Sequence, residues 1–79
     1  MRLLPLKSSM IASVGYDPAL EAMVVQFNSG KIYRYDGVPS DAFVAVVTAK
    51  GSVGKMFNFH IKNKAYPFRQ LKPDEVQNL

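Results

Sequence analysis

The sequence predicts an α+β fold, in which a three-stranded antiparallel β-meander is followed by two α-helices packed on one face of the sheet. Two segments with the β-branched and aromatic content of strands, residues 11–16 and 22–27, come first. A third segment, Tyr33-Arg34-Tyr35, alternates its side chains between two faces. Helical spacing of apolar residues begins only after Pro39. This order, strands first and helices second, is typical of α+β domains.

The length of 79 residues leaves room for one domain. A chain this short buries only about 60 % of the surface that its unfolded form exposes, so most large apolar side chains should serve folding. We expect one domain over residues 1–79, with a folded core at about residues 7–69 and a frayed tail at residues 70–79.

Composition excludes several classes of protein. The sequence has no cysteine, so it can form neither a disulfide framework nor a thiolate zinc site. Its longest apolar run, residues 42–47, is far shorter than the roughly 20 residues that span a bilayer. We predict an intracellular, cytoplasmic protein that uses no metal and no cofactor and does not contact a membrane.

A hairpin should join the second and third strands. Asn28-Ser29-Gly30 has the length of a three-residue loop, and Gly30 suits the left-handed position of a type I turn with a G1 bulge. Such a loop places Phe27 opposite Lys31, and cross-strand partners share a face. Residues 23, 25 and 27 then lie on the face of Tyr33 and Tyr35, beneath the helices, while residues 24, 26, 32 and 34 lie on the other face.

The two tyrosines of this strand have two possible roles. The predicted register favours rings packed in the core with their hydroxyls at a polar rim. Rings offered to a ligand beside basic side chains are the alternative, and a slip of the strand by one residue would exchange the faces.

Helix signals follow the third strand. Pro39 suits a first turn, Ser40 can cap it, and Asp41 suits the positive end of the helix dipole. Gly51 should end this helix, and the second helix should run over residues 53–64. The second helix turns Val53, Phe57, His60 and Ile61 inward, turns Lys55, Asn58 and Lys62 outward, and leaves Phe59 as an exposed aromatic.

Both ends of the chain have an expected place. Leu3, Leu4 and Leu6 around Pro5 form an apolar arm, which should lie on the domain as an edge strand or as a cover for an open sheet face. The aromatic segment 66–69 should pack, and residues 72–79 should fray.

The net charge of +4 is unevenly distributed. Residues 1–49 hold four basic and four acidic residues, whereas residues 50–72 hold six basic and no acidic ones. Such a run is the electrostatic footprint of a surface that meets phosphates, and it is equally typical of a solvated helix face.

Reaction chemistry is hard to find in the sequence. Residues 51–55, Gly-Ser-Val-Gly-Lys, do not meet the phosphate-loop pattern, because only two residues separate the glycines and Met56 follows the lysine. The start of the second helix could still hold an anion on free backbone N–H groups. His60 has no acidic residue within helical reach and should be packed rather than a ligand or base. We predict that the protein is not an enzyme.

Several motifs, in order and at compatible spacings over about residues 7–69, resemble the KTSC domain: Ser8-Ser9-Met10-Ile11, Val14-Gly15-Tyr16-Asp17, Phe27-Asn28-Ser29-Gly30, Tyr33-Arg34-Tyr35, Val38-Pro39 and Ser52-x-Gly54-x-x-Phe57-Asn58-x-x-Ile61. This short module occurs at the C-terminus of some bacterial lysyl-tRNA synthetases and as small stand-alone proteins of bacteria and phages. The resemblance maps the family's Tyr-x-Tyr motif onto Tyr33 and Tyr35. It implies no established activity, and the suspicion of RNA binding in the family rests on the synthetase context.

The leading hypothesis is a small non-catalytic binding module for RNA or another phosphate-bearing ligand, which would use the basic C-terminal helix. Lysine and arginine side chains would contact phosphates, the helix start would offer N–H groups, and an aromatic ring could stack on a base. The candidate residues are Ser52, Gly54, Lys55, Asn58, Phe59, Lys62, Lys64, Arg69, Tyr33 and Tyr35.

Two other hypotheses stay open. The sheet face bearing Val24, Ile32 and Arg34 could be left open, so that it pairs with a second copy or a protein partner. A pocket for a small signalling nucleotide at the start of the second helix is the third possibility.

Overall fold

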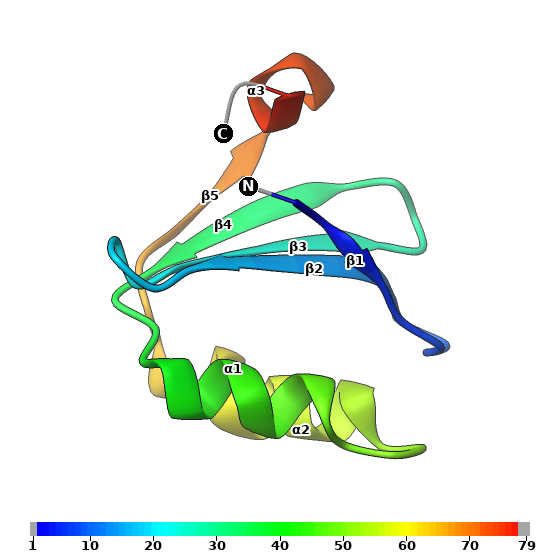
Figure 1. Ribbon diagram of the computed structural model, residues 1–79. Helices are drawn as coiled ribbons and strands as arrows, with labels where there is room; N and C mark the ends of the chain where they lie inside the picture. Colours follow the sequence, from blue (N-terminus) through cyan, green and yellow to red (C-terminus); the bar gives the residue numbers. More distant parts are fainter. Residues whose placement is uncertain (1, 78–79) are drawn as a thin grey trace.

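The structure is a computed structural model, and it describes residues 2–77. Five antiparallel strands form one sheet in the order β1-β2-β3-β4-β5 (Figure 1). The strands are β1 (Leu4–Pro5), β2 (Ile11–Asp17), β3 (Ala22–Phe27), β4 (Ile32–Asp36) and β5 (Phe68–Leu71). The helices are α1 (Ser40–Val47), α2 (Val53–His60), the 3-10 helix η1 (Lys62–Lys64) and α3 (Pro73–Gln77).

The α+β class and the central meander are confirmed, but the prediction of three strands and two helices is wrong. β1 is the apolar arm, which pairs with β2 through Leu4 and Val14. β5 returns after α2 and pairs with β4 from Tyr35–Phe68 to Ile32–Leu71. The tail expected to fray at residues 70–79 instead completes β5 and forms α3, as far as residue 77; residues 78–79 lie outside the described residues.

The predicted hairpin register is confirmed. The amides of Phe27 and Gly30 bond to the carbonyls of Lys31 and Phe27, both at 2.9 Å, and Gly30 has a φ of +95°. Val25 therefore lies opposite Tyr33, and Met23 opposite Tyr35. Because side chains alternate, this pairing places both tyrosines on the face that the helices cover.

Helices α1 and α2 lie side by side under one face of the sheet, which we call the inner face (Figure 1). A register shift between Ile11 and Ser13 in β2 lets both Ile11 and Val14 point to this face. The buried side chains of the main core are Ile11, Val14, Met23, Val25, Tyr35, Val38, Ala42, Val46, Val53, Phe57 and Ile61.

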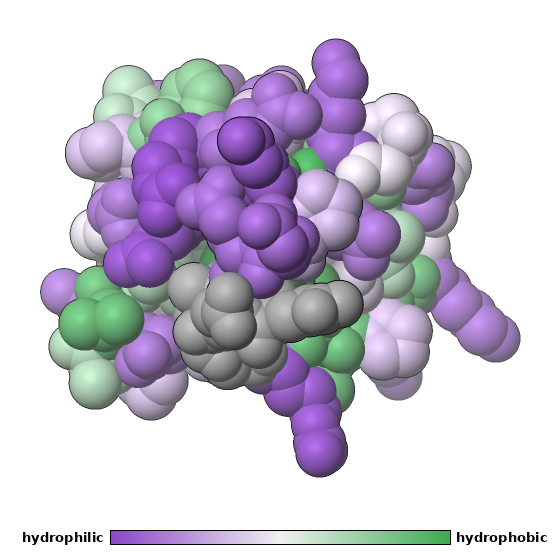
Figure 2. All heavy atoms as spheres, turned by 90° about the horizontal axis from the view of Figure 1, so that it is seen from above, coloured by the Kyte–Doolittle hydropathy of each residue, from purple (hydrophilic) through white to green (hydrophobic). Residues whose placement is uncertain are grey.

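The opposite, outer face of the sheet is closed. Val24 is 0 % and Ile32 6 % exposed, and with Leu71 they form a second small core against Leu3 and Val76. The predicted open face is therefore wrong, because the N-terminal arm and α3 cover it. Seen from this side, most of the visible surface is hydrophilic, and apolar side chains form small separate patches (Figure 2).

The helix ends differ slightly from the prediction. Pro39, not Ser40, is the N-cap of α1, and its carbonyl accepts from the amide of Ala42 at 3.1 Å. α2 ends at His60, and the chain tightens into η1 where a helix to residue 64 was expected. Ala65 then adopts a left-handed conformation, φ 56°, which turns the chain toward β5.

Candidate functional site

A pocket of about 530 Å³ opens between the inner face of the sheet and the end of α2. Its walls come from the β3–β4 turn, from β4, from η1 and from the start of β5. The residues that line it are Ser9, Met10, Phe27, Asn28, Ser29, Lys31, Tyr33, Tyr35, Ile61, Lys62, Ala65, Tyr66 and Phe68. Both residues of the Tyr-x-Tyr motif thus belong to it.

Aromatic rings build the wall of this pocket. Tyr33 lies edge to face against Phe27 and Phe68, with ring centroids 5.8 and 6.0 Å apart. Tyr35 contacts Phe68 at 5.5 Å and Phe57, in the core below, at 5.6 Å. Two aromatic rings in edge-to-face or tilted geometry at these distances attract each other, so these rings form a rigid surface.

Of the two positions left open by the sequence, the structure shows features of both, because the tyrosine rings pack against the core and also line the pocket. Tyr35 is buried, at 5 % exposure, and Tyr33 is half-buried, yet both line the pocket. Within residues 2–77, neither hydroxyl has a protein hydrogen-bond partner. In the same range no fully buried side-chain polar atom lacks a partner, so both hydroxyls retain some accessible surface. By contrast, the hydroxyl of Tyr16 donates to the carbonyl of Val38 at 2.6 Å.

The hydroxyl of Tyr35 is also held in its neutral form. Burial raises the pKa of Tyr35 above its ordinary 10.0, and the neighbouring Tyr33 raises it further. At neutral pH Tyr35 therefore presents an O–H group to the pocket, which can donate and accept hydrogen bonds, rather than a phenolate.

The charged residues of the pocket are both cations. Lys31 and Lys62 are exposed, and no aspartate or glutamate lines the pocket. Within the described part of the chain neither lysine has an ion-pair partner, because the two ion pairs found there join Arg34 to Asp36 and Arg69 to Glu75.

Neutral polar groups gather at the β3–β4 turn. The side-chain amide of Asn28 donates to the carbonyl of Ser8 at 3.0 Å, and its backbone amide donates to Met10. These bonds tie the segment before β2 to the turn, so that Ser9 and Ser29 meet at the same end of the pocket as Asn28.

The predicted residues at the start of α2 lie elsewhere. Ser52 occupies the N-cap position without a side-chain hydrogen bond to the helix. Gly54 packs near Met10, whose Cε would lie 3.6 Å from an added Cβ. Neither residue lines the pocket, and the pocket is at the end of α2, not at its start, where the nucleotide hypothesis expected one.

Other predicted residues lie on the outside of α2. Phe59 is 60 % exposed, as expected, and with Lys55, Met56 and His60 it borders a second, shallow hollow of about 360 Å³. His60 is only half-buried and contacts the edge of the Phe59 ring at 4.9 Å. Asn58 and Lys64 are exposed and line neither hollow. The predicted site thus divides, and only Lys62, Tyr33 and Tyr35 meet in the pocket.

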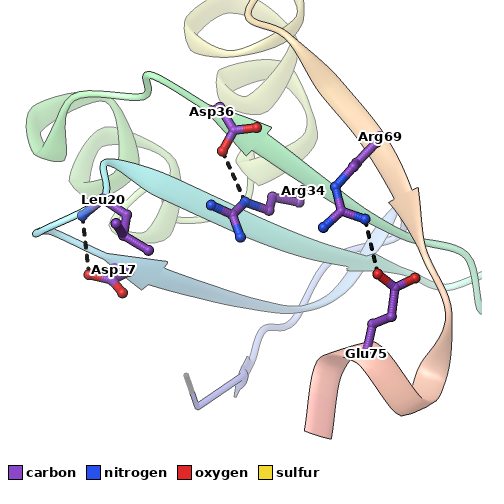
Figure 3. Close-up of polar contacts among 6 residues, drawn as sticks. All are labelled: Asp17, Leu20, Arg34, Asp36, Arg69 and Glu75. Carbon is purple, nitrogen blue, oxygen red and sulfur yellow. Dashed lines mark hydrogen bonds and ion pairs between the residues drawn. The ribbon is translucent and has the colours of Figure 1, made fainter. Parts of the chain in front are cut away.

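Arg69 lies on the outer face, away from the pocket (Figure 3). Its guanidinium donates to the Glu75 carboxylate of α3 at 3.0 Å. The same carboxylate accepts the backbone amide of Lys72, and these bonds lower the pKa of Glu75 below its ordinary 4.5. Arg69 therefore fastens α3 to the sheet.

Sequence reasoning missed Lys31, Phe27 and Phe68 as site residues. The predicted register already placed Phe27 beside the two tyrosines, and Lys31 directly precedes their strand, so these two could have been found. Phe68 could not, because its position depends on the pairing of β5 with β4.

Two other kinds of site have no counterpart among the described residues. Among residues 2–77, no three histidine, aspartate or glutamate side chains come together as a metal site would require. In the same range, no helix has the length and apolar content needed to cross a bilayer.

Comparison with known proteins shows which family this chain is similar to. The sequence model of the KTSC domain family matches residues 7–66 of the chain. An uncharacterised protein from Stutzerimonas stutzeri is 38 % identical over 71 residues, which cover 90 % of this chain and 99 % of that protein. A protein from Tsukamurella paurometabola is 36 % identical over 58 residues, which cover 73 % and 85 % of the two chains.

A solved structure shares the fold. The crystal structure of a KTSC domain protein from Yersinia pestis superposes with a TM-score of 0.82 at 32 % sequence identity, and the match covers 90 % of this chain and 97 % of that one. The names of these proteins state no activity, so the function has to be argued from the site itself.

Proposed function

This chain belongs to the KTSC domain family, and we propose that it is a small non-catalytic binding module for RNA or another phosphate-bearing ligand. The ligand binds in the pocket along β4, with Lys62 contributing from the basic C-terminal segment. One observation carries the proposal: within residues 2–77, the hydroxyls of Tyr33, Tyr35 and Tyr66 have no protein hydrogen-bond partner, and they line the same pocket as Lys31 and Lys62, which have no ion-pair partner.

Charge supports an anionic ligand. Lys31 and Lys62 face the pocket, and among residues 2–77 no carboxylate lines it, so these residues leave the two ammonium groups free to bind a phosphate. The attraction between a lysine and a phosphate at the protein surface weakens as the salt concentration rises, because dissolved ions screen it. The Debye length is about 8 Å at physiological ionic strength. Binding should therefore weaken as salt rises.

The lining chemistry supports binding rather than catalysis. General acid–base work at neutral pH needs a group that titrates near that pH, most often histidine or a shifted carboxylate. The pocket is lined instead by neutral hydroxyls, amides, apolar rings and two lysines.

The test compares three pairs of charge reversals, each removing the same net charge. Fluorescence anisotropy with a labelled single-stranded RNA would be recorded at low and physiological salt. The pocket pair is Lys31→Glu with Lys62→Glu. The second pair, Lys55→Glu with Lys64→Glu, changes lysines of α2 and η1 that do not line the pocket. The matched control is Lys7→Glu with Lys50→Glu, because Lys7 and Lys50 are exposed and line neither hollow.

The expected result is loss of binding, by about tenfold or more, in the pocket pair alone, with circular dichroism showing that all variants remain folded. Equal weakening by all three pairs would mean nonspecific attraction to a basic protein. Loss of binding only in the Lys55→Glu/Lys64→Glu pair would place the binding site on the exposed side of α2 and η1. Absence of binding by any phosphate-bearing probe at low salt would overturn the proposal.

A further inference from the structure

The pocket is shaped for one particular unit of such a ligand. Resting on the function proposed above, we infer that the pocket binds a single nucleoside phosphate unit, with the base against the aromatic wall and the phosphate at Lys31 and Lys62. The unit comes either from a free mononucleotide or from one unpaired nucleotide of an RNA strand, and both present the same chemistry to these residues.

Size agrees with one nucleotide. The pocket volume of about 530 Å³ lies in the lower half of the range of about 300–1,000 Å³ that holds a drug-sized molecule. The pocket follows the chain from Lys31, just before β4, to Tyr35, four residue steps that correspond to about 13 Å of extended chain. This space suits one base with its sugar and phosphate, and a stacked or paired helix cannot enter it.

The aromatic wall calls for a flat ring. Tyr33 contacts Phe27 and Phe68 edge to face in the pocket wall, and Phe68 is 63 % exposed, so its ring is open to a ligand. Stacking of a base on an aromatic side chain contributes about 1–3 kcal/mol. A flexible aliphatic anion would gain nothing specific from this wall.

The free hydroxyls call for heteroatoms at the edge of that ring. Tyr33 and Tyr35 point to the same face of β4, and within residues 2–77 their O–H groups bond to no protein atom. A purely hydrocarbon ring would strip these hydroxyls of water and leave them unpaired, at a cost of about 1–3 kcal/mol each. A nucleobase supplies ring nitrogens and carbonyl oxygens that pair with them.

Cations and neutral polar groups occupy the remaining lining. Lys31 adjoins the β3–β4 turn, where Ser9, Asn28 and Ser29 also line the pocket, and Lys62 contributes from the helical wall. Hydroxyl and amide groups beside cations suit a ribose next to its phosphate. The pocket thus offers an aromatic wall to the base, hydroxyl and amide groups to the ribose, and two lysines to the phosphate.

The experiment measures binding to the full chain by calorimetry and by amide chemical shifts. The probes are inorganic phosphate, adenosine, uridine, AMP, UMP, and a short single-stranded RNA tested alone and in a duplex. The key variant is Tyr33→Phe with Tyr35→Phe, which keeps both rings and their packing. Its control is Tyr16→Phe, which removes the hydroxyl of a tyrosine that does not line the pocket.

The expected result is saturable binding of a mononucleotide, at least tenfold tighter than its nucleoside and than inorganic phosphate. Shifts should be confined to residues of the pocket, and the double Tyr→Phe variant should lose about tenfold in affinity while Tyr16→Phe keeps the affinity of the wild type. If AMP or UMP binds as tightly as the single strand, the source is the free nucleotide. If the single strand binds at least tenfold tighter and the duplex does not bind, the source is an unpaired nucleotide of RNA.

Failure of this inference differs from failure of the proposed function. If inorganic phosphate or any polyanion binds as tightly as the mononucleotides, and the Tyr→Phe variant is unaffected, the pocket recognises charge alone; the inference falls and the phosphate-binding module stands. If no phosphate-bearing probe binds, both fall.

Discussion

Arg34 of β4 and Arg69 of β5 lie directly opposite each other on the outer face of the sheet, and each has its own carboxylate partner (Figure 3). Nε of Arg34 lies 2.9 Å from Asp36, and Nη1 of Arg69 lies 3.0 Å from Glu75. Like charges directly across a strand pair destabilise a sheet. The two carboxylates offset this repulsion, and the second of them also brings α3 onto the sheet.

Replacement of Glu75 by glutamine should loosen α3. The lowered pKa of Glu75 means that the folded state favours the carboxylate, so its contribution is present above about pH 4.5 and is lost as pH falls through the lowered pKa. Amide hydrogen exchange should show several-fold weaker protection of α3 in Glu75→Gln at pH 7, and in the wild type at pH 3. Amides of α2 serve as the internal control, and unchanged α3 protection in both cases would refute this role.

Replacement of Phe57 by alanine should be the most costly change in α2. Phe57 is 0 % exposed and contacts the rings of Phe27 and Tyr35, and such truncations cost about 3–5 kcal/mol. A total free energy of unfolding of about 5–15 kcal/mol is typical, so most of the stability would be lost. Urea denaturation measures the change, and Phe59→Ala on the exposed side should cost about 0.5 kcal/mol or less.

Alanine at two glycines should have opposite effects. Gly30 has a φ of +95°, where a Cβ is disfavoured, and Gly30→Ala should cost about 1–2 kcal/mol. Gly54 lies inside α2, and an added Cβ meets Met10 at an ordinary contact distance of 3.6 Å. Gly54→Ala should stabilise the protein by about 0.5–1 kcal/mol.

The Gly54 variant also tests the phosphate site predicted at the start of α2. Ligand affinity should be unchanged in Gly54→Ala, because the pocket lies at the other end of the helix. A tenfold loss of affinity with unchanged or raised stability in urea would show that the start of α2 takes part in binding.

Alkaline pH should destabilise the fold through Tyr35. Because burial raises the pKa of Tyr35, the unfolded chain releases this proton at a lower pH than the folded one. The associated stability is fully present below about pH 10 and is lost as pH rises through the raised pKa. Melting temperature should fall less steeply between about pH 10 and 11 in Tyr35→Phe than in the wild type; parallel curves would contradict the assignment.

Local signals in the sequence predicted much of the fold. Gly30 fixed the length of the hairpin loop, and that loop alone set which side chains of β3 and β4 share a face. The prediction placed Tyr33 and Tyr35 on the helix-covered side because no distant contact was needed. The hairpin was predictable since its geometry is decided within a few residues.

Distant pairing was not predictable. β5 has no simple alternation of apolar and polar residues: Phe68 lines the pocket, Arg69 pairs with α3, and Leu71 enters the outer core. Each is explained only by its neighbour on β4 or beyond. The candidate pocket was not predictable for the same reason, because Lys31 and Lys62 come together only when the sheet and η1 pack.

β5 takes part in three separate regions of the structure. Phe68 lines the pocket, Arg69 holds α3, and Leu71 fills the outer core, so β5 contributes to all three at once. A chain cut or stalled before Phe68 would keep most of its main core and yet have no finished pocket. Completion of the pocket therefore depends on β5, and a single proteolytic cut in the segment that joins η1 to β5 would separate β5 from the rest of the chain.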